Sequence, residues 1–474
     1  MSRPAPDPLL TAIADYLVSP LDASEEAAET ARLCLLDALG CAFAALAHPE
    51  CTKLLGPVVP GTRVPHGARV PGTPFALDPV KAAFDLATMI RWLDFNDTWL
   101  AAEWGHPSDN LGAVLATADW RARRARAAGE PVPRMEEVLE ALIKAYEIQG
   151  VLALDNAFNR VGLDHVILVK LASCAVCTRL LGGGREEIVD ALSQVWVDGH
   201  PLRTYRHFPN TGPRKSWAAG DAAGRAVQLA LLTLAGEIGY PTALSAPRWG
   251  FQEVLFGGRE VRLSRPLAGY VIENILFKVA YPAEFHAQTA VEAALALHPA
   301  VRERIGEIER ITIRTQEAAV RIIDKKGPLH NPADRDHCLQ YMVAVPLLFG
   351  RLTARDYEDE VAADPRIDAL RARMEVTEDP AYTAAYHDPG RRAIPNALRV
   401  FFGNGDATEE VEILYPLGHR RRRREALPHL EEKFRSHLAA RFPRRRQERI
   451  LEATADRAAI AALPVDRFVD LFVP

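Results

Sequence analysis

Apolar residues recur with the spacing of a helix up to about residue 245. Within 135–156 they return every three or four positions, so they share one face of a helix. Ser24 precedes an acidic turn and an apolar run, which is the pattern of a helix N-cap. A shorter apolar run predicts a helix at 81–90, and Arg91 and Asp94 lie at its C-terminal end. We expect a large helical region, with further helices over 111–128, 166–181 and 186–198.

The pattern changes near residue 270, where apolar and polar residues begin to alternate in short runs. The run 307–315 is typical of a strand with one buried face. A small sheet with helices packed on it is therefore expected in this region. Its other predicted members are strands at 397–402 and 409–415 and helices near 287–298 and 336–350.

Helical spacing returns late in the chain, over 428–442 and 447–462. A chain of 474 residues is too long for one small core, so length alone favours two domains. We predict a mainly α fold. Residues 1–270 and 410–474 are expected to form one large all-helical domain, and residues 271–409 a smaller α+β lid domain inserted between these two parts.

Composition limits the classes of partner. Apolar residues make up 48% of the chain and charged residues 25%, which is ordinary for a globular protein. The formal net charge of -5 argues against a general nucleic-acid binder. No apolar signal segment occurs near Met1, and the best apolar stretch, 166–181, is interrupted by Lys170 and Arg179. We therefore expect a cytoplasmic protein without a membrane or nucleic-acid partner.

The six cysteines are expected to be reduced thiols, because the chain is long and carries no secretory signal. Cys174 and Cys177 have the spacing of a metal-binding pair. They lie, however, in a strong helical pattern, where residues three apart share a buried face and cysteine packs as a small apolar residue. No second pair of this spacing exists, so packing is favoured over a zinc or iron–sulfur site, and no metal is predicted.

A polar stretch, 91–110, interrupts the helical pattern with many groups that carry chemistry. Its aromatic residues must be buried, so the stretch is anchored rather than disordered. One interpretation is a capped corner, in which Asp94 or Asp97 caps one helix and the Ser-Asp-Asn segment at 108–110 caps the next. Capping accounts for Asp, Ser and Asn but not for Arg91 or His106, and both interpretations remain open on composition alone.

Two more polar clusters lie far along the chain, at 203–217 and 278–288. Arginine and lysine gathered in a net-acidic protein favour a small polyanionic ligand over a nucleic acid. Carboxylates beside histidine and lysine favour proton transfer. The fingerprints of nucleotide-binding, metalloprotease and serine-hydrolase sites are absent. The cationic residues of these clusters are Arg203, Arg206, Lys215 and Lys278, and the histidine is His286.

Three further features have structural interpretations that we favour on the residues alone. His165, ahead of an apolar helix, is more often a cap or a core histidine. Tyr341 heads an apolar helix and is most simply a core tyrosine with a bonded hydroxyl. The run 420–424 consists of five arginines, but Glu425, Glu431 and Glu432 follow it, so a solvated or interface face is favoured over an RNA-binding patch.

Five sequence blocks resemble the MmgE/PrpD family, in order and over nearly the whole chain. That resemblance implies a large helical domain with an inserted α+β lid, a homodimer, and no iron–sulfur cluster or organic cofactor. It also implies loss of water from 2-methylcitrate to give 2-methyl-cis-aconitate, in propionate breakdown. The blocks are 93–98 (LDFNDT), 106–112 (HPSDNLG), 215–222 (KSWAAGDA), 281–288 (YPAEFHAQ) and 415–419 (YPLGH).

The family also contains animal cis-aconitate decarboxylases, so the resemblance alone leaves the reaction open. Decarboxylation of cis-aconitate and dehydration or hydration of citrate and aconitate are the alternatives. The segment between Thr98 and His106 is longer here than in the decarboxylases, which favours a dehydratase. A non-catalytic binding protein on this fold would be expected to lack one or more cluster residues, and all are present.

The resemblance also assigns site residues, motif by motif. We hypothesise that His106 and Asp94 form the proton-transfer pair, and that Lys215 and His286 bind or polarise the carboxylates of a tricarboxylate substrate. The sequence leaves open which residue is the base and which is the acid. The other catalytic position carried over is Thr98, and the expected substrate-binding residues are Arg91, His165, Arg203, Arg206, Lys278 and Tyr341.

Overall fold

A computed structural model describes residues 4–207 and 209–474 of the chain. The prediction of a mainly α fold with a small sheet region is confirmed. The chain divides into two compact units, the helical unit and the sheet unit. The helical unit comprises Met1–Thr204, Arg214–Ile275 and Leu430–Pro474, and the sheet unit comprises Tyr205–Pro213 and Leu276–His429. The domain limits given above stay a prediction, because a compact unit is not always one that folds alone.

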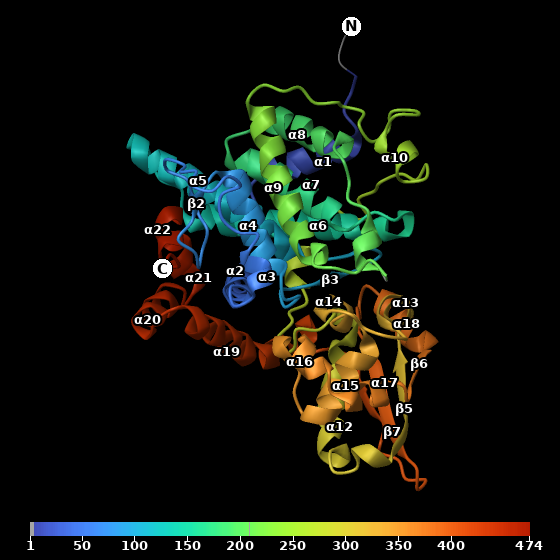
Figure 1. Ribbon diagram of the computed structural model, residues 1–474. Helices are drawn as coiled ribbons and strands as arrows, with labels where there is room; N and C mark the ends of the chain where they lie inside the picture. Colours follow the sequence, from blue (N-terminus) through green and yellow to red (C-terminus); the bar gives the residue numbers. More distant parts are fainter. Residues whose placement is uncertain (1–3, 208) are drawn as a thin grey trace. The chain divides into compact units, whose positions relative to one another are not determined.

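The centre of the helical unit is α4 (Pro79–Arg91), which packs between α5 (Asn110–Ala128) and α9 (Arg214–Leu234) (Figure 1). Glycines make this packing close. A Cβ atom at Gly112 would lie 2.6 Å from the backbone nitrogen of Ala87, and one at Gly220 would lie 2.5 Å from a backbone oxygen of α4. Small residues therefore let both helices approach α4 closely.

The direction of this packing brings helix ends together. Gly220 lies against Thr88, whereas Gly224, one turn later on α9, lies against Val80, two turns earlier on α4. The two helices are therefore antiparallel, so the beginning of α9 lies beside the end of α4. Since α5 also begins next to the later part of α4, at Gly112, three chain segments that carry polar residues meet at one end of this bundle.

The remaining helices of this unit follow the predicted spacing, except that the single helix predicted at 447–462 is divided into α20 (Arg444–Ala453) and α21 (Arg457–Ala462). Ser24 caps its helix as expected, because its hydroxyl accepts a hydrogen bond of 3.0 Å from the Ala27 amide. Early and late parts of the chain share one core, since Phe43 packs edge-on against Phe442 at 5.1 Å. The longer helices are α1 (Pro8–Val18), α2 (Glu25–Ala45), α6 (Met135–Asp155), α7 (Val166–Leu180), α8 (Arg185–Val197) and α20 (Arg444–Ala453), with α21 (Arg457–Ala462) and α22 (Val465–Asp470) near the C-terminus.

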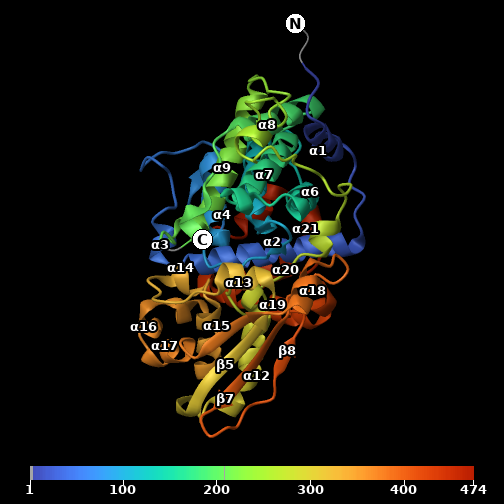
Figure 2. The same cartoon turned by 90° about the vertical axis from the view of Figure 1, so that its right-hand side faces the viewer.

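The sheet unit contains four strands in the order β6-β5-β7-β8 (Figure 2). β5 (Ile308–Thr315) pairs in parallel with β6 (Met374–Glu378) and antiparallel with β7 (Asn396–Phe402), which pairs antiparallel with β8 (Val411–Ile413). Helices α12 (Gln288–Val301), α15 (Leu339–Phe349) and α17 (Pro365–Arg371) belong to the same unit. Alternate residues of β5 and β7, including the cross-strand pair Ile313 and Leu398, are buried in its core.

Two strand predictions need correction. β8 has three residues instead of the seven predicted at 409–415, and β6 was not predicted at all. In β6 only Met374 is buried and Val376 half-buried, so the apolar alternation of this edge strand is too short to identify it. All six cysteines are free and buried, and Cys174 and Cys177 lie inside α7, as packing residues do. Among the described residues, no helix combines the length and apolar character needed to cross a bilayer.

Candidate active site

The polar stretch forms a loop, residues 92–109, between α4 and α5. A small hairpin holds it, in which β3 (Trp99–Leu100) pairs with β4 (Trp104–Gly105). The Trp99 side chain is 1% exposed and its indole nitrogen donates a 3.0 Å hydrogen bond to the Gly150 carbonyl of α6. The expected aromatic anchoring of the 92–109 loop is therefore confirmed.

The capped-corner interpretation is wrong for the residues that follow the hairpin. Asp109 precedes α5 but makes no capping hydrogen bond, and its Oδ1 instead accepts from Asn96 Nδ2 at 3.0 Å. Asp97 accepts from the Ser108 amide at 3.1 Å, from the Ser108 hydroxyl at 2.7 Å and from the Tyr146 hydroxyl at 2.5 Å. These side chains bind one another across the loop, so they fix its shape rather than end a helix.

Burial has an electrostatic consequence for this network. It raises the pKa of Asp97 to about 6, although the hydrogen bonds from Tyr146 and Ser108 oppose that rise. Burying a carboxyl costs free energy. Because Asp97 lies in the centre of the loop, we infer that its side chain stabilises the conformation of the loop.

Asp94 has an unusual backbone conformation. Its φ of 51° lies in the left-handed region, which costs a residue other than glycine about 1 kcal/mol. Asp94 and Arg91 are both 2% exposed, and Arg91 Nη1 donates to Asp94 Oδ1 at 2.6 Å. The same oxygen lies 3.7 Å from Nε2 of His106. The strained backbone thus presents one carboxylate to a buried guanidinium and an imidazole together.

The tautomer of His106 follows from its other contact. Nδ1 lies 2.7 Å from the main-chain oxygen of Asp97, and a carbonyl oxygen can only accept. Nδ1 therefore carries the proton, and Nε2, which faces Asp94, is the nitrogen that exchanges one. The hydroxyl of Thr98 lies 3.4 Å from Nδ1. The structure thus brings together four predicted residues: Arg91, Asp94, Thr98 and His106.

His165 lies next to this group. It precedes α7 but makes no capping hydrogen bond, so the cap interpretation is wrong. Its ring centroid is 5.9 Å from that of His106, and its Nδ1 is 3.5 Å from Asp164 Oδ1. Gly105 lets the side chains of Gln149 and His165 lie close to the backbone of the loop. A Cβ atom at this position would lie 3.0 Å from Gln149 and 3.6 Å from His165.

Arg203 belongs to the same unit and is surrounded by acidic groups. Its Nη1 lies 3.9 Å from Asp164 Oδ2, and its guanidinium lies 5.3 Å from the centre of the Trp104 ring. Burial raises the pKa of Glu103 to about 7, against the opposing influence of Arg203 and of hydrogen bonds from Asn159. Glu103 and Asp164 were not predicted, because isolated acidic residues in a loop carry no spacing signal.

Lys215 lies in the first turn of α9 and is buried. The next residue, Ser216, donates its hydroxyl to the Trp92 carbonyl at 3.1 Å. That bond ties the start of α9 to the residue after Arg91. A helix N-terminus carries a partial positive charge, which favours an anion and disfavours a cation. A buried lysine placed there therefore makes the start of α9 strongly electropositive.

The third cluster lies in the sheet unit. His286 is fully buried; its Nδ1 is 2.8 Å from Glu284 Oε1, and its Nε2 is 3.2 Å from the Tyr386 hydroxyl. Burial alone would raise the pKa of Glu284, but His286, His337 and Lys278 lower it overall. Glu284 is therefore a carboxylate that orients His286. The structure brings two predicted residues, Lys278 and His286, close to the Glu284 carboxylate. Tyr386 and His337, which also belong to this cluster, were not predicted from the sequence.

Tyr341 is placed in the core of the sheet unit. Its hydroxyl donates to the Asp356 carbonyl at 2.6 Å, and its ring stacks on Tyr357 with centroids 5.8 Å apart. Burial raises the pKa of Tyr341. This geometry supports the core interpretation over the substrate-binding role that the resemblance implies. Arg206, also in the sheet unit, lies 5.4 Å from the Tyr205 ring centre, and its role stays a prediction.

The arginine run 420–424 has structural partners. Arg421 donates to the Gly390 carbonyl at 2.8 Å, and Arg422 donates to Glu292 and to the Tyr415 carbonyl, both at 2.8 Å. Arg422 also pairs with Glu425. The run therefore holds segments of the sheet unit together, which agrees with an interface face and not with an RNA-binding patch.

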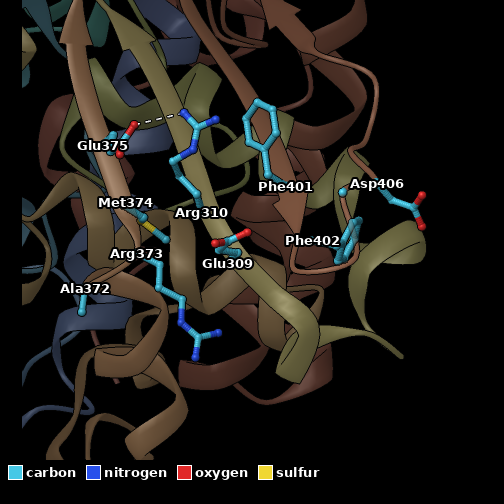
Figure 3. A pocket seen from close by; sticks show the side chains of 10 residues that line it. Glu309, Arg310, Ala372, Arg373, Met374, Glu375, Phe401, Phe402 and Asp406 are labelled. Atoms are coloured by element: carbon cyan, nitrogen blue, oxygen red, sulfur yellow. Dashed lines mark hydrogen bonds and ion pairs between the residues drawn. The ribbon is translucent and has the colours of Figure 1, made fainter.

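An open groove of about 430 Å³ lies at the end of the sheet (Figure 3). Arg310 and Glu375, which line it, form an ion pair of 3.1 Å, and Arg373 donates to the Ile308 carbonyl. Its charged side chains are two arginines and three carboxylates, and none of the predicted site residues lines it. The groove therefore lacks the excess of cations that a tricarboxylate ligand requires.

Comparisons with known proteins cover almost the whole chain. Residues 11–264 match the MmgE/PrpD N-terminal domain, and residues 281–457 match the MmgE/PrpD C-terminal domain. The two matches meet near residue 270, where the sequence pattern changes from helical to alternating.

Curated relatives are similar over nearly their full length. The 2-methylcitrate dehydratase of Escherichia coli (strain K12) is 60% identical over 474 residues, which cover 99% of this chain and 98% of that protein. The 2-methylcitrate dehydratase of Cupriavidus necator is 62% identical over 473 residues, with the same coverage. The mitochondrial 2-methylcitrate dehydratase of Yarrowia lipolytica is 57% identical over 477 residues, which cover 100% of this chain and 91% of that protein.

Proposed function

Because the chain belongs to the MmgE/PrpD family, we propose that it is a hydro-lyase that removes water from 2-methylcitrate to give 2-methyl-cis-aconitate. Full-length relatives with 57 to 62% identity carry the name 2-methylcitrate dehydratase. The observation that best supports the proposal is the buried set of Arg91, Asp94 and His106, in which a carboxylate faces the exchangeable nitrogen of an imidazole.

Substrate recognition is assigned to cations and hydrogen-bond donors. A tricarboxylate carries three negative groups, and each favours a charge-assisted hydrogen bond in a buried site. In the helical unit, Lys215 at the start of α9 is proposed to bind one carboxylate, with His165 as a further donor. In the sheet unit, Lys278, His286 and Arg206 are proposed to bind carboxylates as well.

Proton transfer is assigned to His106 and Asp94. Loss of water breaks a C–H bond next to a carboxylate and a C–O bond on the adjacent carbon, and the C–H electron pair becomes the new double bond. We assign the base to Nε2 of His106, since Nδ1 already donates to the Asp97 carbonyl. The proton ends on His106, and Asp94, 3.7 Å away, stabilises the imidazolium. The His106 imidazolium then returns this proton to the departing hydroxyl, so that the C–O bond breaks, water leaves and the imidazole is neutral again.

Charge that develops on the substrate also needs a partner. Removal of the C–H proton spreads negative charge onto the neighbouring carboxylate. The Lys215 ammonium is proposed to stabilise that charge, because a fixed cation near a helix N-terminus needs no reorganisation when the charge appears. Thr98, which contacts Nδ1 of His106, is proposed to hold the imidazole plane.

The direct test is turnover by the purified protein. It is incubated separately with 2-methylcitrate, citrate and cis-aconitate, while absorbance of the conjugated product and release of CO₂ are followed. Rapid absorbance growth with 2-methylcitrate and no CO₂ supports the proposal. Faster turnover of citrate, or CO₂ release from cis-aconitate, would replace 2-methylcitrate dehydration by one of the alternative reactions of the family.

We further propose a cytoplasmic homodimer that acts in propionate breakdown without an iron–sulfur cluster or organic cofactor. Light scattering after size exclusion measures the oligomer, and a mass near twice 52.2 kDa is expected. Turnover after exhaustive treatment with a chelator tests the cofactor statement, and loss of activity that iron restores would contradict it.

A further inference from the structure

We infer that Lys433, on helix α19 (Arg423–Arg441), is a positioning residue that holds the 92–109 loop in its active shape. This inference rests on the proposed function, since it concerns the same loop. Lys433 belongs to the part of α19 that lies in the helical unit, from Leu430 onward. No sequence motif identified it.

The contacts of Lys433 converge on one loop residue. Its Nζ donates to the Phe95 main-chain oxygen at 2.7 Å and lies 3.7 Å from the centre of the Phe95 ring. The same ammonium forms an ion pair of 2.7 Å with Asp37 of α2, and both side chains are 4% exposed. A buried ammonium thus binds the carbonyl, the ring and a counter-charge at the same time.

Phe95 is the residue through which this contact reaches the chemistry. It follows Asp94, whose φ of 51° needs support from its surroundings. Two residues later, the Asp97 carbonyl holds Nδ1 of His106 at 2.7 Å. A displaced Phe95 carbonyl would therefore disturb Asp94 on one side and, two residues further on, the Asp97 carbonyl that sets the tautomer of His106.

The helices that carry Lys433 and Asp37 are held closely together. Gly40, one turn after Asp37 on α2, leaves room for α19: a Cβ atom there would lie 3.2 Å from His437 and 3.3 Å from Phe434. His437 also packs edge-on against the Phe95 ring, with centroids 5.9 Å apart. The Phe95 side chain is thus in contact with two residues of α19, one turn apart.

A purely structural role is the alternative, and the chain offers a matched control for it. Lys144 on α6 is also a buried lysine of the helical unit, with a side chain that is 6% exposed. It donates to the Ser19 carbonyl at 2.8 Å and pairs with Glu140 at 2.8 Å. Lys144 thus resembles Lys433 in burial, carbonyl contact and counter-charge, but it holds the end of α1 and not the 92–109 loop.

The experiment compares Lys433→Met with Lys144→Met in the full-length enzyme. Both are expected to lower the melting temperature. Lys433→Met is expected to lower kcat about 30-fold or more with little change in KM, since a displacement of 1 Å can cost about 100-fold. Lys144→Met is expected to keep kcat within about twofold. A kcat of Lys433→Met as close to wild type as that of Lys144→Met would overturn the inference.

Two further measurements keep the inference testable if Lys433→Met does not fold or if 2-methylcitrate is not the substrate. Lys433→Arg retains the charge and is expected to recover part of the lost kcat. If Lys433→Met does not fold, Lys433→Gln, which removes the charge, takes its place, and a Lys433→Gln enzyme with unchanged kcat and normal exchange refutes the role. Hydrogen–deuterium exchange over 92–109 needs no substrate: it should rise in Lys433→Met and not in Lys144→Met. If wild-type enzyme leaves 2-methylcitrate unchanged, the proposed function fails, while the exchange result still decides the role of Lys433.

Discussion

Nδ1 of His106 lies 2.7 Å from the main-chain oxygen of Asp97, and this contact decides which nitrogen of the imidazole can take a proton. The carbonyl cannot donate, so Nε2 is left to exchange a proton on the side that faces Asp94. The tautomer of His106 is thus set by the backbone of the loop, and the hydrogen bonds of the Asp97 side chain hold that backbone.

The first prediction concerns His106 itself. His106→Ala is expected to lower kcat by about 10² to 10⁴, because it removes the proposed general base and leaves Lys215, the proposed carboxylate ligand, in place. KM should change much less. The assay is steady-state turnover of 2-methylcitrate, with circular dichroism as the test of folding. His429→Ala, an exposed histidine of the sheet unit, is the control and should behave as wild type. Near-normal turnover in His106→Ala would remove this residue from the mechanism.

Glu103 leads to a prediction about stability and pH. Burial raises its pKa from 4.5 to about 7, so between these values the folded protein keeps a proton that the unfolded chain releases. Its contribution to stability is therefore full below pH 4.5 and is lost as pH rises through 7. Glu103→Gln, which stays neutral, should gain stability relative to wild type from pH 5 to pH 8, by up to about 3 kcal/mol.

The measurement is urea unfolding of both proteins at the two pH values. Glu137→Gln serves as the control, because the side chain of Glu137 is 44% exposed. The difference between Glu137→Gln and wild type should be the same at both pH values. A pH-independent difference for Glu103→Gln as well would show that Glu103 is ionised at pH 5 in the folded state.

For Tyr341 the sequence left two interpretations open, a core tyrosine and a substrate-binding residue, and one substitution distinguishes them. Its hydroxyl donates to the Asp356 carbonyl inside the core, so Tyr341→Phe should lower stability by about 1 kcal/mol through one lost hydrogen bond. KM for 2-methylcitrate should stay within about twofold, since no substrate contact is lost. Thermal unfolding and steady-state kinetics measure the two effects. A large rise in KM with unchanged stability would restore the substrate-binding role.

Much of this site could be predicted because its residues are local in sequence. Arg91 ends α4, and Asp94, Thr98 and His106 lie in the loop that follows; helical spacing on both sides predicted where that loop begins and ends. Local composition was sufficient wherever function and fold depend on neighbours in the chain.

The supporting residues could not be predicted for a physical reason. Tyr146 lies in the middle of an apolar helix, where its spacing is that of a core residue, yet its hydroxyl binds Asp97. Lys433 is 338 positions from Phe95, and nothing in its own segment distinguishes it from other lysines on helices. Contacts of this kind depend on which helices pack together, and periodicity predicts the helices but not their partners.

The last prediction concerns Tyr386, which only the structure identified. Its hydroxyl lies 3.2 Å from Nε2 of His286, whose Nδ1 is bound to the Glu284 carboxylate. Tyr386→Phe removes the partner of Nε2 and should lower kcat/KM by about 3- to 10-fold, with a shifted pH–rate profile. Tyr382→Phe is the matched control on the same helix, α18 (Pro380–His387), because its hydroxyl binds Glu412 instead. Equal effects of the two substitutions on the pH profile would show that Tyr386 acts only through stability.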